Sequence, residues 1–116
     1  MNKVMFIGRI TKDIEVKRFK DNDKCVTTFS LAVEREFNGA NGEKLVDFIP
    51  IVAWNKDAEF LSKYAKKGSR ICVMGRLEIR SYETKDGERR YMTQVVAQGV
   101  QVLDAKILKE ENVEAI

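Results

Sequence analysis

The most informative segment of the sequence for the fold runs from Leu45 to Gly68 and reads LVDFIPIVAWNKDAEFLSKYAKKG. Its first part, Leu45 to Trp54, is rich in β-branched and aromatic residues, which predicts a β-strand. Pro50 within this strand cannot donate a backbone hydrogen bond, so we expect a sheet edge or a bulge there. The remainder of the segment predicts a helix, and a helix directly after this strand restricts the β folds that the chain can adopt.

The predicted helix begins at Asn55, which can cap the first turn, and ends at Gly68, which follows two lysines that suit a last turn. Apolar residues recur in it at helical spacing: Phe60, Leu61, Tyr64 and Ala65. We expect this face, with both aromatic rings, to pack on the core.

Strand-forming segments flank this unit on both sides. We expect strands at Val4–Ile10, Cys25–Val33, Ile71–Glu83, Tyr91–Ala97 and Val100–Leu103. Turn residues at 38–42 (NGANG) and 85–88 (KDGE) predict hairpin tips, the second of which closes a long β-hairpin. In Cys25–Val33 the odd-numbered residues form one side, as in a half-buried strand.

This order predicts an all-β protein with the OB-fold, a five-stranded Greek-key barrel. The helix then lies between the third and fourth main strands, and residues 1–103 form the domain. Another all-β barrel or sandwich remains open from the pattern alone. Residues 104–116 are expected to form a short acidic tail, polar and at most partly helical.

Composition excludes several functions. The 116 residues suit one domain, and the chain contains no histidine, so neither a Ser-His nor a Cys-His nucleophile can form. Cys25 and Cys72 are too few for a four-thiolate zinc site, and we expect both to be buried and reduced. No Gly-rich phosphate loop is present. We therefore predict no enzyme, no catalytic residue, no metal and no cofactor; a carboxylate-dependent nuclease is the one enzyme alternative considered.

The expected cellular location and the net charge restrict the classes of molecule that the protein can bind. No apolar run approaches the ~20 residues of a membrane span, and the N-terminus lacks the apolar block of a signal peptide, so a cytoplasmic protein is expected. Residues 1–103 hold 19 basic and 14 acidic groups, a net charge of +5. Residues 104–116 hold two lysines and four acids, a net charge of −2. A basic body indicates a polyanionic partner.

The strand Leu45–Trp54 has two apolar sides. Phe48 and Trp54 share one side, and Ile49, Ile51 and Ala53 occupy the other. One side is the core and the other a binding or subunit surface, but the alternation does not say which. Phe37, beside the hairpin tip at 38–42, is either a plug on its own loop or a platform for stacking.

The strand from Arg76 carries Arg76, Glu78, Arg80 and Tyr82 on one side. Leu77 and Ile79 lie on the other side, which we expect to face the core. Cations that alternate with a ring suit single-stranded nucleic acid, because phosphates need charge and unstacked bases need a flat apolar partner. A solvated strand face is the alternative interpretation.

These segments resemble the bacterial and phage single-stranded DNA-binding protein family over about residues 2–103. The resemblance is carried by residues 2–4 (NKV), 7–13 (IGRITKD), 29–33 (FSLAV), 47–50 (DFIP), 52–56 (VAWNK) and 75–82 (GRLEIRSY). It implies an OB-fold, a homotetramer, and binding of single-stranded DNA without sequence preference in replication, recombination and repair.

The resemblance also implies the site residues. Its stacking positions fall on Phe37, Phe48, Trp54 and Tyr82. Its phosphate-contacting positions fall on Lys3, Lys56, Lys67 and Arg80, to which strand geometry adds Arg9 and Arg76. Family members in cells recruit replication and repair proteins through a linker with an acidic tip, a role for which residues 104–116 are short. A primosome-type OB protein that bridges helicase and DNA is the alternative function.

Overall fold

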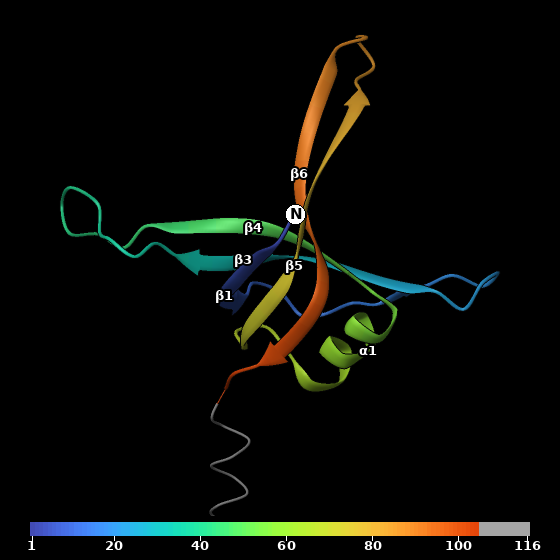
Figure 1. Ribbon diagram of the computed structural model, residues 1–116, viewed down its shortest axis with the longest axis horizontal. Coiled ribbons are helices and arrows are strands. Elements are labelled where there is room, and N and C mark those ends of the chain that lie inside the picture. The colour runs from blue at the N-terminus through green and yellow to red at the C-terminus, as the bar shows by residue number, and fades with distance from the viewer. Residues whose placement is uncertain (105–116) are drawn as a thin grey trace, which may run out of the picture.

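The computed structural model describes residues 1–104, which fold into six strands and one helix (Figure 1). In chain order these are β1 (Val4–Ile10), β2 (Lys17–Arg18), β3 (Cys25–Glu34), β4 (Val46–Trp54), α1 (Asn55–Tyr64), β5 (Arg70–Glu83) and β6 (Arg89–Val102). β2 is a two-residue addition, so five main strands remain, with α1 between the third and fourth. This is the predicted OB-fold order. The predicted tail lies outside the described residues from position 105 onward.

The main strands close into a barrel. The sheet order is β1-β5-β6-β4-β3-β2, and β1 also pairs with β3 through Arg9 and Ile10. A side chain at Gly8 would clash with the carbonyl oxygen of Ala32, so glycine permits the close approach of β1 to β3 at this closure. Pro50 pairs with Ser30 of β3, and the pairing of β4 with β6 begins only at Ile51. The predicted sheet edge at Pro50 is therefore confirmed.

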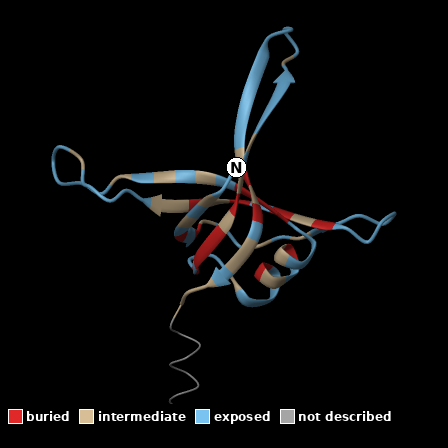
Figure 2. Cartoon of the chain, viewed as in Figure 1, coloured by how far each residue is buried: buried red, intermediate tan, exposed pale blue. Residues whose placement is uncertain are grey.

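The core fills the barrel and the space under α1 (Figure 2). Its buried members are Ile10, Phe29, Leu31, Ile51, Ala53, Leu61, Ile71, Val73, Val95 and Ala97. The odd-numbered residues of β3 face inward, as predicted for a half-buried strand. Cys25 and Cys72 are buried free thiols, which confirms the prediction of reduced cysteines.

Three extensions leave the barrel in different directions (Figure 1). They are the β2–β3 connection, the β3–β4 connection and the long β5–β6 hairpin, which turns at Gly87 with a φ of 83°. Figure 2 shows these extensions as mostly exposed. The prediction that Leu77 and Ile79 face the core is therefore wrong: they are 38% and 64% exposed. Within residues 1–104, no other strand or helix covers the face of the hairpin that carries them.

β6 is one strand, whereas the sequence predicted a return strand and a separate final strand. Met74 pairs with Gly99 and Gly75 pairs with Ala97, which leaves Gln98 as an extra residue. Such a bulge bends a strand without ending its pairing. The strand thus follows the barrel wall and then continues into the hairpin.

The helix is shorter than predicted, because it ends at Tyr64 and not near Gly68. The backbone N–H of Gly68 donates to the carbonyl of Ile10, and the N–H of Ile10 donates to the carbonyl of Ser69, at 2.8 and 2.9 Å. Pairing with the end of β1 therefore takes these residues out of the helix. No helix among residues 1–104 has both the length and the apolar character to cross a membrane.

The buried residues of α1 are Ala58 and Leu61. Phe60 is only half-buried and Tyr64 is exposed, and their ring centroids are 5.0 Å apart. The prediction that both rings join the core is wrong, because neither Phe60 nor Tyr64 belongs to the core cluster. Tyr64 lies at the end of a ten-residue helix, where its ring contacts Phe60 and stays about half exposed.

Candidate nucleic-acid interface

The outer face of β3 and β4 carries two of the predicted stacking residues. Directly paired residues in neighbouring strands share a sheet face, and Phe48 pairs with Ala32 while Trp54 pairs with Val26. Ile51 and Ala53, on the other side of β4, are buried in the core. Phe48 is 63% exposed and Trp54 41% exposed. The alternative that these two rings form the core is therefore wrong.

This outer face continues onto the long hairpin. Val52 of β4 pairs with Val96 of β6, which in turn pairs with Arg76 of β5. An open groove of about 410 Å³ lies along the junction. Its walls come from the outer faces of β3, β4 and β6, from the loop after β1 and from the core residues Phe29 and Ile51. The other lining residues are Thr11, Lys12, Thr28, Ser30, Pro50, Met92 and Gln94. The hairpin thus forms one side of a channel whose floor is the β3–β4 face.

The hairpin presents a row of charges and a ring on this same face. Arg76, Glu78, Arg80 and Tyr82 alternate along β5, opposite Val96, Gln94, Met92 and Arg90 of β6. The Tyr82 ring is about half exposed. The structure therefore brings Arg76, Arg80 and Tyr82 together on one face, as the alternation predicted.

Glu78 is held tightly between these cations. Gln94 donates its side-chain N–H to one carboxylate oxygen at 2.7 Å, and Arg76 contacts the other at 3.4 Å. The hydrogen bond from Gln94, with the positive charges of Arg76 and Arg80, holds the pKa of Glu78 below its ordinary value. Glu78 is therefore ionised at neutral pH and partly neutralises the row.

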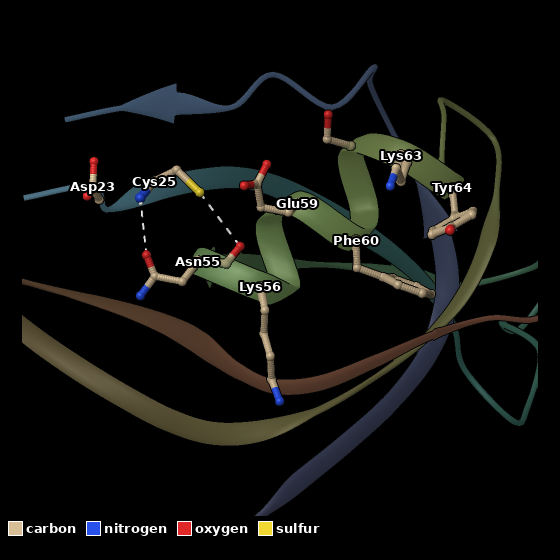
Figure 3. Close-up of a pocket in the computed structure, with 9 residues that line it drawn as sticks. Asp23, Cys25, Asn55, Lys56, Glu59, Phe60, Lys63 and Tyr64 are labelled. Atoms are coloured by element: carbon tan, nitrogen blue, oxygen red, sulfur yellow. Dashed lines mark hydrogen bonds between the residues drawn. The ribbon is translucent and has the colours of Figure 1, made fainter. Parts of the chain in front are cut away.

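Contacts between Asn55 and Cys25 at the start of α1 fix the backbone next to Trp54 (Figure 3). Asn55 has a φ of 52°, a left-handed conformation that Asn tolerates better than most residues. Its side-chain oxygen accepts the backbone N–H of Cys25 at 3.2 Å, and its carbonyl lies 3.6 Å from the Cys25 sulfur. The predicted helix cap at Asn55 is wrong, because this oxygen bonds to β3. Lys56 follows and points away from Cys25.

Three of the predicted phosphate contacts, Lys3, Arg9 and Lys67, lie away from the β3–β4 face and the charged row on the hairpin. The side chain of Asn2 makes two hydrogen bonds with the backbone of Leu77, at 2.7 and 2.9 Å, and so holds Lys3 near the base of the hairpin. Arg9 donates to the carbonyl of Gly68 at 2.9 Å, next to Lys67. Arg9 and Lys67 thus form a second basic group, separated from Lys56 by the length of α1.

Phe37 is exposed on the β3–β4 connection, apart from the other rings. Arg35 fixes the base of this connection, because it donates to both carboxylate oxygens of Asp47 at 2.9 and 3.0 Å. The same pair lowers the pKa of Asp47. Phe37 therefore extends from an anchored base, and its exposure of 66% does not fit the alternative of a plug packed on its own loop.

The chemistry available at this surface is stacking and charge neutralisation. Lys3, Lys56, Lys67 and Arg80 form no salt bridge with any other described residue. Within residues 1–104, no group of three or more Cys, Asp or Glu side chains is placed to hold a metal ion.

Sequence reasoning missed several side chains at this surface. Phe19 stacks against Trp54, and Met92 and Gln94 line the groove. The run Lys17-Arg18-Phe19-Lys20, in which a ring lies among cations, was a signal for Phe19. Met92 and Gln94 gave no such signal, since only the pairing of β5 with β6 brings them to the groove.

Comparison with known proteins agrees with this geometry. The model of the single-strand binding protein family matches residues 1–103. A single-stranded DNA-binding protein of Clostridium tetani is 50% identical over 104 residues, which span 90% of this chain and 71% of that protein. The single-stranded DNA-binding protein of Streptococcus pneumoniae serotype 4 is 44% identical over 110 residues, which span 95% of this chain and 70% of that protein.

A relative and a solved structure of similar length extend the comparison. Single-stranded DNA-binding protein 1 of Clostridium acetobutylicum is 44% identical over 108 residues, which span 91% of this chain and 96% of that protein. The structure of the Plasmodium falciparum SSB complex with single-stranded DNA superposes with a TM-score of 0.75 at 28% identity, over 90% of this chain and 96% of that one. The chain belongs to the single-strand binding protein family.

Proposed function

We infer that this protein binds single-stranded DNA without sequence preference and coats it during replication, recombination and repair. The observation that carries this inference is the outward position of Phe48 and Trp54 on a face that continues to Arg80 and Tyr82. The family is non-enzymatic, and the protein acts by binding. Membership of this family leaves the primosome-type alternative without support.

Binding combines two contributions. Each base that stacks on a side-chain ring adds about 1–3 kcal/mol, and every base has a flat face, so stacking does not select a sequence. Lysines and arginines neutralise phosphates and release counterions, which makes the affinity fall as salt rises. Bases in a duplex are already stacked on each other, so duplex DNA offers only the second contribution.

We propose that Phe37, Phe48, Trp54 and Tyr82 stack on bases, and that Lys3, Arg9, Lys56, Lys67, Arg76 and Arg80 contact phosphates. Exposure of all four rings supports the first set. The proposed contacts are widely separated: they lie at Phe37, on the β5–β6 hairpin and at the Arg9–Lys67 group. This separation supports a path in which the DNA wraps around the protein, because a straight DNA strand could not reach all three places.

We further propose a homotetramer. The residues of β1 before Arg9 pair with β5 on one edge, and no described strand pairs with their other edge. Met5 and Ile7 are exposed on the outer side of β1, next to a hollow of about 470 Å³ that Ile7 helps to line. An open strand edge beside exposed apolar side chains suits pairing with a second copy.

We propose that the protein acts in the cytoplasm, on single-stranded regions of the nucleoid DNA. Recruitment of replication and repair proteins through residues 104–116 is a further proposal, supported only by the acidic composition of that segment.

The direct test is a fluorescence titration with poly-dT oligomers. Trp54 is the only tryptophan of the chain, so its emission reports on the site alone. We expect quenching on binding, an affinity that falls with salt, and weak binding of a duplex of the same length. Absence of quenching, or equal affinity for the duplex, would contradict the proposed function.

A further inference from the structure

Phe19 forms a ring pair with Trp54 at the entrance to the β2–β3 connection. The two ring centroids are 6.2 Å apart and the ring planes differ by 20°, an offset stack. Phe19 is 36% exposed and is not a member of the core cluster. The aromatic surface around Trp54 therefore continues beyond β4.

A cation accompanies this second ring. Lys17 of β2 pairs with Val26 of β3, which pairs with Trp54 of β4, so all three side chains share the outer face. The Lys17 ammonium lies 5.5 Å from the centroid of the Phe19 ring, within the range of a cation–π contact. Lys17 forms no salt bridge with a described residue, so its charge is available to a phosphate.

The backbone holds these groups in place. The N–H of Phe19 donates to the carbonyl of Lys24 at 2.8 Å, which closes the connection just beyond the ring. Arg18 contacts Glu59 of α1 at 2.7 Å, which joins β2 to the helix that begins after Trp54. Phe19 and Trp54 are thus tied to the same helix.

We propose that Phe19 and Lys17 form a further nucleotide subsite, which extends the single-stranded DNA path from Trp54 onto the β2–β3 connection. A base stacks on the exposed surface of Phe19, and the adjoining phosphate contacts Lys17. The subsite accepts any base, since every base has a flat face that can stack on the ring. This inference rests on the proposed binding at Trp54.

The test compares Phe19→Leu, which keeps apolar bulk beside Trp54 but removes the flat ring, with the matched control Phe19→Tyr, which keeps the ring. Binding of a poly-dT oligomer is measured by anisotropy of a labelled oligomer, with the wild type in parallel. We expect Phe19→Leu to weaken binding by about 5- to 150-fold, the range for loss of one stacked base. The number of nucleotides occluded per subunit should fall by about one, and Phe19→Tyr should behave as wild type.

Lys17→Ala, compared with Lys17→Arg, examines the phosphate contact. The slope of log affinity against log salt should decrease in magnitude by about one for Lys17→Ala and stay unchanged for Lys17→Arg.

The outcomes separate the two inferences. If the wild type does not bind the oligomer, the proposed function fails. If the wild type binds but Phe19→Leu keeps both affinity and site size, the subsite does not exist. Tighter binding by Phe19→Leu would mean that Phe19 covers the stacking surface of Trp54, which also overturns the subsite. Melting temperatures of both variants verify that the fold is intact.

Discussion

At the scale of single residues, Trp54 combines a fixed position with an exposed ring. Cys25 binds the residue that follows it, and Phe19 supports one of its faces. Little conformational freedom therefore remains to be lost when a base stacks on it, which favours binding.

We predict that Trp54→Ala weakens binding of a labelled poly-dT oligomer by about 1–3 kcal/mol, while Trp54→Phe retains most of the affinity. Fluorescence anisotropy measures both. Because the ring is partly exposed, the melting temperature should change little. Unfolding of Trp54→Ala would instead show that the ring stabilises the fold.

Glu78 opposes binding of phosphates at neutral pH. Its lowered pKa keeps the carboxylate charged there, where it repels phosphates and pairs with Arg76. We predict that Glu78→Gln binds single-stranded DNA more tightly than wild type at pH 7. The control is Glu83→Gln, since Glu83 lies opposite Arg89 on the other face of the hairpin and should have little effect.

The pH dependence follows from the direction of this shift. The wild-type carboxylate becomes protonated only as the pH falls through a pKa below the ordinary value of about 4.3. The affinity of wild type should therefore rise toward that of Glu78→Gln as the pH falls through this region, while circular dichroism verifies folding. A difference between the two proteins that stays constant as the pH falls would show that the charge of Glu78 does not oppose binding.

At the level of secondary structure, the long β5–β6 hairpin has two faces that carry different kinds of side chain. Arg76, Arg80 and Tyr82 lie on the face that continues the β3–β4 surface, and Leu77 and Ile79 lie on the other. The two faces differ in chemistry and in burial: Leu77 and Ile79 are exposed, whereas Arg76 and Glu78, at the base of the other face, are only partly exposed.

Arg80→Ala should reduce the magnitude of the salt slope by about one, which corresponds to one phosphate. The matched control is Arg89→Ala on the same hairpin. Arg89 pairs with Glu83 and donates to the hydroxyl of Ser81 at 3.1 Å, so it lies on the opposite face. Equal slopes for Arg80→Ala and wild type would exclude Arg80 from the path.

At the scale of the whole molecule, three extensions leave a small barrel, and the proposed contacts are distributed over all of them (Figure 1). One chain therefore offers separated parts of a DNA path. Several copies together can join such parts into a continuous track, which agrees with the open edge of β1.

Light scattering should give four times the chain mass of 13.3 kDa for the wild type. Ile7→Glu places a charge on the exposed side of β1 and should lower the mass and weaken binding to long oligomers, because burying an unpaired charge is costly. Tyr91→Glu, on the hairpin, serves as the control for added charge. A monomeric wild type, or a tetramer unaffected by Ile7→Glu, would contradict this assembly surface.

The order of the other strands and of the helix could be predicted from sequence patterns, although β2 was not predicted and β6 was predicted as two strands. In β3 one side is apolar and the other mainly polar, so alternation alone identified its buried side. The strand-to-helix change at Trp54 predicted the start of α1 correctly, because the spacing of apolar residues differs between the two structures. Family motifs indicated which rings and cations belong to the proposed site.

Which apolar side of β4 is buried could be learned only from the three-dimensional fold. Both sides are apolar, and burial depends on which one meets α1 and the opposite barrel wall. The same reason explains the error at Leu77 and Ile79, because alternation separates the two faces of a strand but does not reveal whether another element covers either. Phe19 reaches Trp54 only through the pairing of β2, β3 and β4, which is a long-range contact that local sequence does not encode.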